Sequence, residues 1–451
     1  MTRSRQLPSV LVCGLLVLLL LAPIAPVRRA LVSARPFVRD SIAGRALAYP
    51  PTTAQCLALF GIHCYQPAQI QAAYDLAPLH SRGVTGRGET IAVVDSFGSP
   101  TIRNDLHVFD QTFGLSDPSL QIIAPAGPIP PFDVTNPDMV GWAQETTLDV
   151  EWAHVMAPGA KILLVETPVS ETEGVQGFPE IVKAENFVID HGLADVISQS
   201  FGATEETFPS PQSIYALRGS FINALAHRVT VLGSSGDDGA TDAQLNGVDL
   251  YTTRVNSWPS SDPLVTSVGG TQLDLNDRGQ RLAPDVVWND GFGAGGGGVS
   301  AVFGRPDFQD RVARMTDRHR GTPDISLSAA VDGGVIVYYS FLGTASPYHI
   351  FGGTSEASPL FAGVVALADQ LAGHRLGWIN PALYSLRASR IVDVTQGNNT
   401  FGPFTNSDGN TYTVIGYNAG PGYDLASGLG TLDAAQFVPA LVRASDGGGD
   451  S

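Results

Sequence analysis

The segment GGTSEASPLFAG at residues 352–363 holds a serine in a setting that suits a nucleophile. Two glycines and a threonine lead into Ser355, and small and apolar residues follow it. Several hydrolases expose a nucleophilic serine on a tight glycine turn at the start of a helix. A serine hydroxyl attacks well only when a neighbouring base takes its proton. The first question is therefore which residue acts as that base.

Histidine, the usual base for serine, has no suitable context in this chain. VVDSFG puts Asp95 at the end of a predicted strand, where the aspartate of a Ser-His-Asp triad could stand, but no HGT-type helix start accompanies it. The nine histidines, His107, His154 and His227 among them, are interpreted as surface or packing residues. A neutral serine protease or esterase with an unrecognised histidine stays as an alternative, which histidine replacements and a pH profile would detect.

A pair of carboxyl groups is the replacement candidate for the base. In GWAQETTLDVEWAHVMAP (141–158), Glu145 and Asp149 are four residues apart and share one face of a helix. Two carboxyls in a partly buried site share a proton and titrate at separated pH values. The simpler interpretation is an ordinary acidic helix face, but the apolar residues around the pair, such as Trp142 and Trp152, disfavour a solvated helix.

A further acid follows a strongly apolar predicted strand. In GSSGDDG (233–239), Asp237 would lie near the carboxyl end of that strand, in the region where an oxyanion needs a donor. An ionised carboxylate repels an oxyanion, whereas a protonated carboxyl donates a hydrogen bond to it. Taken alone, the segment is more often just a turn formed by Asp237 or Asp238.

The elements that must position these residues read as an α/β domain. Apolar, β-branched runs predict strands, and longer periodic segments predict helices between them. The predicted strands are 90–96, 160–166, 194–202, 228–236, 264–270 and 334–340, and the predicted helices are 142–156, 176–191, 215–227 and 355–372. Continuous apolar strands alternating with helices indicate a parallel sheet covered on both faces. Functional groups then gather at the carboxyl ends of the strands.

Composition sets limits on the class of protein. The 451 residues contain 43% hydrophobic residues, enough for one large domain, and only 15% charged residues. The net charge of −17 argues against a nucleic-acid partner, because no basic stripe is present to neutralise phosphates. Few lysines and arginines also mean little positive charge when the carboxylates protonate, which suits an acidic medium.

The N-terminus has the pattern of an export signal. Arg3 and Arg5 precede an apolar run from Val10 to Ala22, and small residues follow. We expect residues 1–34 to be a signal peptide or, if uncleaved, a membrane anchor, so the remainder is secreted or faces outward. Cys56 and Cys64 could then close a small disulfide loop, or remain two buried thiols.

Together these motifs resemble the sedolisin family, the serine-carboxyl peptidases. Glu-x-x-x-Asp, SGD-x-G and GGTS-x-x-x-P occur in the family's order between residues 83 and 433. The resemblance implies a subtilisin-like fold and an acid-active endopeptidase that hydrolyses protein or peptide substrates. It makes Ser355 the nucleophile, Glu145 the base, Asp149 its orienting partner and Asp237 a protonated oxyanion donor. Tripeptide release from N-termini stays open.

The resemblance also implies one structural Ca²⁺ ion. IVDVTQGNNT supplies Asp393 and the carbonyl of Val394, while NAGPGYDLASGLG supplies Gly420, Gly422 and Asp424. Two carboxylates and backbone carbonyls form an oxygen-only set suited to Ca²⁺. Without the resemblance, these segments read as surface turns capped by aspartates. Ligand clusters for a metal hydrolase are missing from the sequence.

The resulting organisation is a leader or linker at 35–80, a single peptidase domain at 81–443 and a tail at 444–451. The family usually has a large N-terminal prodomain, for which the roughly 50 residues after the signal are too few. We therefore expect an unusual activation route or a partner that assists folding. A monomer is expected. The alternative from another class is a secreted binding protein that keeps the fold without turnover.

Overall fold

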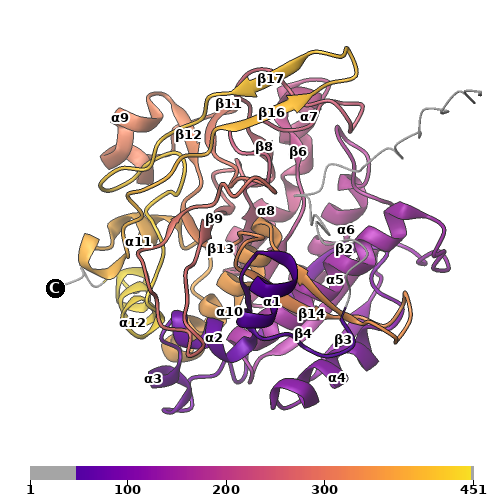
Figure 1. Ribbon diagram of the computed structural model, residues 1–451. Coiled ribbons are helices and arrows are strands. Elements are labelled where there is room, and N and C mark those ends of the chain that lie inside the picture. The colour runs from indigo at the N-terminus through magenta and orange to yellow at the C-terminus, as the bar shows by residue number, and fades with distance from the viewer. Residues whose placement is uncertain (1–46, 448–451) are drawn as a thin grey trace, which may run out of the picture. The chain divides into compact units, whose positions relative to one another are not determined.

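The computed structural model describes residues 47–447 (Figure 1). The predicted signal or anchor at 1–34 lies outside the described residues. Between residues 47 and 447, none of the helices combines the length and apolar character needed to cross a bilayer.

The centre of the fold is an eight-stranded sheet whose strands run in the order β10, β9, β7, β5, β2, β4, β3, with β13 also paired to β9. All of its pairings are parallel except that of β10 with β9. Its strands are β2 Thr90–Ser96, β3 Leu120–Ile123, β4 Lys161–Thr167, β5 Val196–Gln199, β7 Thr230–Ser234, β9 Thr266–Gln272, β10 Val286–Val287 and β13 Ile325–Ser328. The predicted α/β class with a parallel sheet is confirmed.

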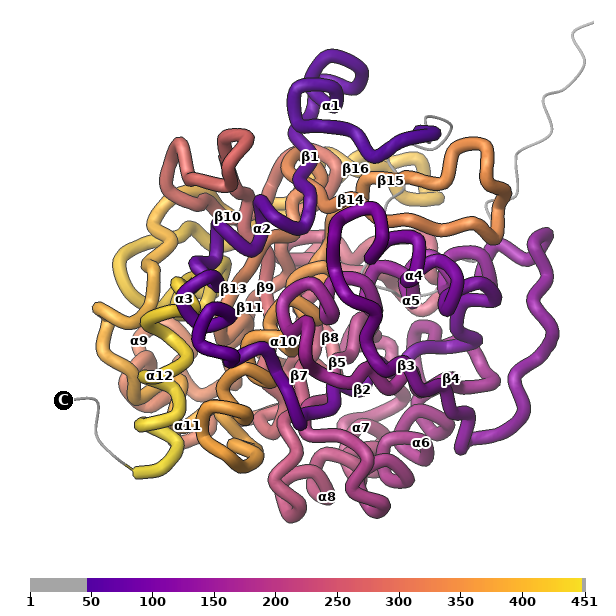
Figure 2. The backbone as a smooth tube through the Cα atoms, turned by 90° about the horizontal axis from the view of Figure 1, so that it is seen from below, coloured from indigo at the N-terminus to yellow at the C-terminus, as the bar shows by residue number. Residues whose placement is uncertain are grey.

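Both faces of this sheet are covered, which explains the continuous apolar runs. Successive side chains of a strand point to opposite faces, so each strand feeds two cores. In β2, Ile91 and Val93 belong to one core, whereas Ala92 and Val94 belong to the other. The first core includes side chains of the helices α4 (Ile102–Phe113), α5 (Pro137–Met156), α10 (Thr354–Ala372) and α12 (Ala434–Ser445). The second includes side chains of α6 (Phe178–Asp190), α7 (Pro211–Leu217) and α8 (Gly219–His227), which lie together in Figure 2.

The long helices lie close to their predicted positions. The predicted helix 215–227 is divided into α7 and α8, because the chain turns at Arg218. The helices are α1 Thr53–Phe60, α2 Pro67–Ala73, α3 Ala77–His80, α4 Ile102–Phe113, α5 Pro137–Met156, α6 Phe178–Asp190, α7 Pro211–Leu217, α8 Gly219–His227, α9 Ala313–Thr316, α10 Thr354–Ala372, α11 Asn380–Ser385 and α12 Ala434–Ser445. Because α12 runs to Ser445, the predicted tail begins inside a helix.

The predicted strand at 334–340 does not join the parallel sheet. It forms β14 Gly334–Tyr338, which pairs antiparallel with β15 Tyr348–Phe351 and parallel with β1 Cys64–Tyr65 in a separate three-stranded sheet. An apolar run alone does not reveal a strand's partner, so the sequence could not distinguish these sheets. Smaller pairs complete the structure: β6 Ala203–Thr204 with β8 Ser257–Trp258, β11 Gly298–Gly304 with β12 His319–Thr322, and β16 Phe401–Thr405 with β17 Thr411–Val414.

Residues 47–80, the described part of the predicted leader or linker, belong to the folded domain. Tyr65, Ile70 and Tyr74 are fully buried in the first core. Leu47 pairs with Tyr348 of β15, so this segment contacts both edges of the β14–β15 hairpin. The physical reason is that the segment buries apolar and aromatic side chains, which a solvated linker would expose.

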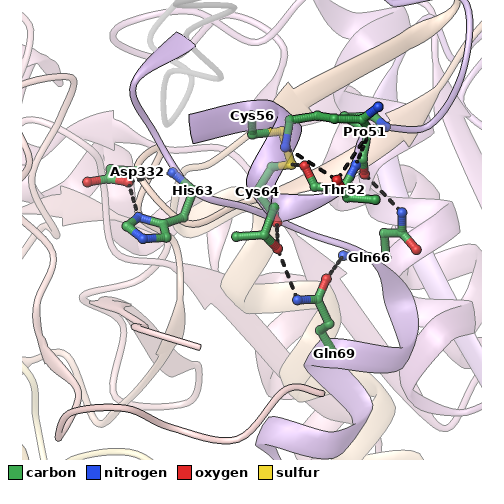
Figure 3. Close-up of a disulfide and its surroundings, with 10 residues drawn as sticks. Pro51, Thr52, Cys56, His63, Cys64, Gln66, Gln69 and Asp332 are labelled. Atoms are coloured by element: carbon green, nitrogen blue, oxygen red, sulfur yellow. Dashed lines mark hydrogen bonds and ion pairs between the residues drawn. A yellow bond between two sulfur atoms is a disulfide. The ribbon is translucent and has the colours of Figure 1, made fainter. Parts of the chain in front are cut away.

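A disulfide joins Cys56 to Cys64, settling the choice that the sequence left open (Figure 3). Around it, Thr53 Oγ1 donates to the carbonyl of Cys64, and Gln69 Nε2 donates to Thr53 Oγ1. His63 contacts Asp332 with both its backbone N–H and its ring, at 2.7 and 2.8 Å from the same oxygen. The covalent loop therefore lies inside a network of paired polar groups.

Candidate functional site

The candidate nucleophile lies in the first turn of α10, where β15 ends. Gly353 precedes the helix with φ 133°, a conformation that side chains other than glycine rarely adopt. A Cβ on Gly352 would lie 2.7 Å from the carbonyl oxygen of Ala329, and one on Gly353 would lie 2.8 Å from Asp237 Oδ2. The two glycines let the chain approach these neighbours closely, and Ser355 is fully buried at this point.

Asp237 is held against the same turn by Thr354. The Oδ1 atom of Asp237 accepts the backbone N–H of Thr354 at 2.8 Å, and the Thr354 hydroxyl lies 2.8 Å from the same oxygen. Asp237 Oδ2 has no hydrogen-bond partner among residues 47–447 and faces Gly353. Oδ1 thus holds the carboxyl group in place, and Oδ2 faces the nucleophile turn.

Burial raises the pKa of Asp237 well above its ordinary 3.8, although the two contacts from Thr354 act in the opposite direction. The nearby charges of Asp238 and Asp242 raise it further. A protonated carboxyl at this position can donate a hydrogen bond, which an ionised one cannot. This is the property that an oxyanion donor requires.

Glu145 and Asp149 reach the site from α5, and both are fully buried. Asp149 Oδ1 accepts the hydroxyl of Ser200 at 3.0 Å, and the same hydroxyl lies 3.4 Å from the backbone carbonyl of Ser355. Ser200 therefore links Asp149 of the predicted carboxyl pair to the nucleophile turn. The four-residue spacing that the sequence analysis singled out is a helical spacing in the structure.

The pKa of Asp149 is raised well above 3.8, first by burial and then by the charges of Asp95 and Glu145. The hydrogen bond from Ser200 lowers it by a smaller amount. Asp95 ends the central strand β2 and is fully buried, so a third carboxyl belongs to this cluster. Three acids this close cannot all ionise, so the cluster retains protons.

Three of the nine histidines interpreted as surface or packing residues, His107, His154 and His227, have contacts away from Ser355. His107 is exposed and lies 2.7 Å from Asp117, and the exposed His227 contacts the carbonyl of Asn223. His154 is fully buried 3.3 Å from Asp110. These contacts account for the histidines without a role at Ser355.

Sequence reasoning did not select Ser200 or Thr354, which connect the acids to the nucleophile turn. Ser200 follows β5 at the carboxyl edge of the sheet, and that location is the signal that could have identified it. Thr354 lies within the quoted GGTS motif, but its contact with Asp237 crosses 117 residues of sequence. Long-range hydrogen bonds of this kind leave no local pattern.

The candidate calcium ligands come from two loops that lie side by side. Asp393 Oδ2 accepts the N–H of Gly422, and Asp424 Oδ2 accepts the N–H of Gly420, both at 2.9 Å. Asp424 is buried and Val394 is fully buried, and the Val394 carbonyl lies 3.5 Å from the Ser427 hydroxyl. Two carboxylates and neighbouring carbonyls provide the oxygen donors that Ca²⁺ prefers. The residues therefore fit such an ion in chemistry.

Clusters of three or more histidine, cysteine or acidic side chains arranged to hold a metal are absent from residues 47–447. The candidate calcium set contains only two such side chains and depends on carbonyls for the rest.

Comparison with known proteins finds a matching family model and several similar proteins. The model of the subtilase family of peptidases matches residues 139–388, more than half of the chain. Kumamolisin from a Bacillus species is 32% identical over 388 residues, covering 84% of this chain and 64% of kumamolisin. Tripeptidyl-peptidase 1 of the dog is 28% identical over 322 residues, covering 66% of this chain and 52% of the relative. The chain thus spans less than two thirds of the length of either.

A solved structure of Pseudomonas sedolisin, described as a serine-carboxyl proteinase in complex with pseudo-iodotyrostatin, superposes with a TM-score of 0.70. It is 29% identical and covers 84% of this chain and 98% of that one. The subtilisin-like fold expected from the sequence motifs is confirmed. The chain belongs to the subtilase family, in its sedolisin branch.

Proposed function

We propose that the chain is an acid-active serine-carboxyl endopeptidase. The observation that carries this proposal is the convergence of buried acids from α5 and from the loop after β7 on the turn that holds Ser355. The names of its relatives, which include peptidases and a serine-carboxyl proteinase, support the same activity.

In the proposed reaction, Glu145 accepts the proton of Ser355 as the hydroxyl oxygen attacks the carbonyl carbon of the peptide bond. Asp149 orients Glu145 and shares its proton, while the proton on Asp237 Oδ2 is donated to the oxyanion. Glu145 then returns the proton to the leaving amine, which breaks the C–N bond and leaves an acyl group on Ser355. Attack by water, with Glu145 again as base, releases the second product.

The protonation states of the acids favour activity at acid pH. Histidine is protonated at about pH 4 and cannot accept the serine proton, whereas a carboxylate can. Asp237 must keep its proton to donate, and its raised pKa favours this state. We expect the activity to be highest in acid and to fall as the pH rises through the pKa of Asp237.

The test is cleavage of acid-denatured haemoglobin by the purified protein from pH 2 to 8, beside Ser355→Ala. We expect an acidic optimum and no cleavage by the variant. An optimum at or above pH 7 would contradict the carboxyl mechanism, as would cleavage by Ser355→Ala at acid pH. A folded protein without cleavage at any pH would favour the alternative of a binding protein.

Release of tripeptides is the second candidate, because tripeptidyl-peptidases occur among the relatives. Mass spectrometry of the products separates the two: internal fragments support endopeptidase action, and successive N-terminal tripeptides support the alternative. We further propose that the protein is exported, acts as a monomer on protein or peptide substrates, and holds one Ca²⁺ ion at Asp393, Val394, Gly420, Gly422 and Asp424.

A further inference from the structure

Glu356 follows the candidate nucleophile directly and is a buried acid that the proposed reaction does not use. Both Ser355 and Glu356 are fully buried. Adjacent residues of a helix point about 100° apart, so the two side chains face different neighbours. The turn that holds Ser355 contacts Asp237 and Ser200, whereas Glu356 lies with Ser328 of β13 and Tyr74, which follows α2.

The surroundings of Glu356 offer it few donors. Neither carboxyl oxygen has a hydrogen-bond partner among residues 47–447. The Ser328 hydroxyl is near enough to favour the charged form of Glu356, but it also has no partner at hydrogen-bond distance among residues 47–447. The Tyr74 hydroxyl is occupied as an acceptor of the Ser328 N–H at 2.7 Å. The carboxyl group is therefore buried without the contacts that an ionised acid requires.

The charged groups nearest to this cluster neutralise one another. Arg281 lies over the ring of Tyr74, with its guanidinium carbon 5.5 Å from the ring centroid. The same Arg281 forms a two-pronged ion pair with Asp285, at 2.7 and 3.0 Å. Tyr74 is a titratable neighbour of Glu356, and burial and the Asp285 charge raise its pKa, so that this tyrosine stays neutral. A compensating cation for an ionised Glu356 is not among these neighbours.

The N-terminus of α10 is the remaining feature that favours a negative charge. A helix N-terminus stabilises a carboxylate in its first turn, but by less than the cost of burying an unpaired charge. Burial accordingly raises the pKa of Glu356 well above its ordinary 4.5. Because the proton is held more tightly in the folded state, Glu356 favours folding below about pH 4.5, and this advantage is lost as the pH rises.

We propose that Glu356 is a positioning residue that keeps the nucleophile turn in place only as a neutral acid, so that its ionisation displaces Ser355. Gly353, Thr354, Ser355 and Glu356 share one helical turn, in which the Glu356 N–H donates to the Gly353 carbonyl at 2.9 Å. An ionised Glu356 gains hydration only if this turn moves outward, and Ser355 moves with it. The inference rests on the proposed nucleophilic role of Ser355.

The experiment measures the irreversible loss of activity during incubation at different pH values, separately from the pH dependence of catalysis. The purified protein is incubated at pH values from 4 to 8, returned to pH 4, and assayed on acid-denatured haemoglobin. Since every assay is made at pH 4, the protonation of Asp237 during catalysis does not affect the comparison. We expect the pH at which half the activity survives to rise by about one unit or more in Glu356→Gln, a roughly tenfold change in proton affinity.

Asp369→Asn is the matched control on the same helix. Asp369 is buried near the other end of α10, and burial raises its pKa to about 8. It accepts the N–H of Leu376, a bond that the asparagine oxygen can keep. Because this acid stays protonated at pH 7, we expect Asp369→Asn to lose activity at the same pH as the unmodified chain.

The outcomes separate this inference from the proposed function. Equal loss of activity in Glu356→Gln and the unmodified chain overturns the role of Glu356, even if Ser355→Ala is inactive. Should glutamine prevent folding, Glu356→Met provides an uncharged side chain without polar atoms. If Glu356→Met keeps its activity after incubation at neutral pH, the inference is supported. If Glu356→Gln and Glu356→Met are both inactive even after incubation at pH 4, the inference is overturned. Cleavage by Ser355→Ala would instead overturn the proposed function.

Discussion

The segment at residues 47–80 and the nucleophile turn at 352–356 treat their polar groups in opposite ways. In the N-terminal segment, Thr52 and Gln55 form a reciprocal helix cap, and Gln69 and His63 also have partners. At the nucleophile turn, carboxyl oxygens of the neighbouring acids lack hydrogen-bond partners within the described chain. These oxygens belong to Asp149, Asp237 and Glu356.

This difference separates stability from function. Paired groups and a disulfide stabilise the fold without preparing any group for reaction. Buried acids with few donors cost stability at neutral pH, but they remain protonated or share protons, as acid–base chemistry requires. Proteins tend to violate ordinary rules of polar pairing at functional sites. We therefore expect changes at the nucleophile turn to affect rate and changes in residues 47–80 to affect stability.

The largest effect is expected from Asp237→Ala. Loss of one oxyanion donor costs about 10²–10³ in kcat. The melting temperature at pH 4 should also fall, because the buried backbone N–H of Thr354 loses its acceptor, whereas the Thr354 hydroxyl keeps the Gly236 carbonyl at 3.2 Å. Steady-state kinetics and thermal unfolding at pH 4 measure the two effects.

Asp238→Ala is the control, because it changes the adjacent acid, which is partly exposed. Equal loss of kcat in both variants would show that the loop conformation matters rather than a donor at Asp237. A fall in melting temperature without a fall in kcat would remove Asp237 from the functional side of the comparison.

Removal of the disulfide tests whether the segment at residues 47–80 affects stability and not rate. The bridge closes a loop with a sequence separation of 8 residues. For a loop of this size the chain-entropy model gives a loss of about 2.5 kcal/mol in the free energy of unfolding. We expect the paired change Cys56→Ser and Cys64→Ser to lower the melting temperature and leave kcat at 25 °C unchanged.

Leu57→Ser on the exposed side of α1 serves as the control for that helix. If the double variant keeps its melting temperature, the N-terminal segment contributes less to stability than its contacts indicate. If kcat falls while the protein is fully folded, the segment also positions the β14–β15 hairpin that leads to Ser355.

The sequence predicts those features of the site and of the fold that depend on a local pattern of residues. The strand at 90–96 is predicted with its observed bounds, and the helical spacing of Glu145 and Asp149 follows from four intervening steps. The N-terminal segment was missed because its helices are short and gain their stability from packing against distant residues. The link from Asp149 through Ser200 depends on contacts across 51 residues, which one sequence does not encode locally.

Treatment with a chelator tests whether the candidate calcium loops contribute to stability or to the rate of catalysis. A ligand at tenfold its dissociation constant stabilises the folded state by about 1.4 kcal/mol. We expect a chelator to lower the melting temperature of the unmodified chain and to have no such effect on Asp424→Ala. Since the hydrogen bonds of Asp393 and Asp424 go to Gly422 and Gly420 of these same loops, kcat at 25 °C should be unchanged. An unaltered melting temperature after chelation would contradict the calcium proposal.

The smallest effect is expected at the ion pair of His63 and Asp332. Each side chain is 31% exposed, and their closest atoms are 2.8 Å apart. Solvent screens such a pair, so we expect a coupling energy of about 0.2–1 kcal/mol. A double-mutant cycle of His63→Gln and Asp332→Asn by thermal unfolding at pH 5 measures it. High salt should weaken the coupling while leaving kcat unchanged, because the backbone N–H of His63 keeps its contact with residue 332. A coupling energy above this range, or a fall in kcat, would mean that this partly exposed ion pair holds the β14–β15 hairpin in position. Stability and function would then not be divided between the two regions.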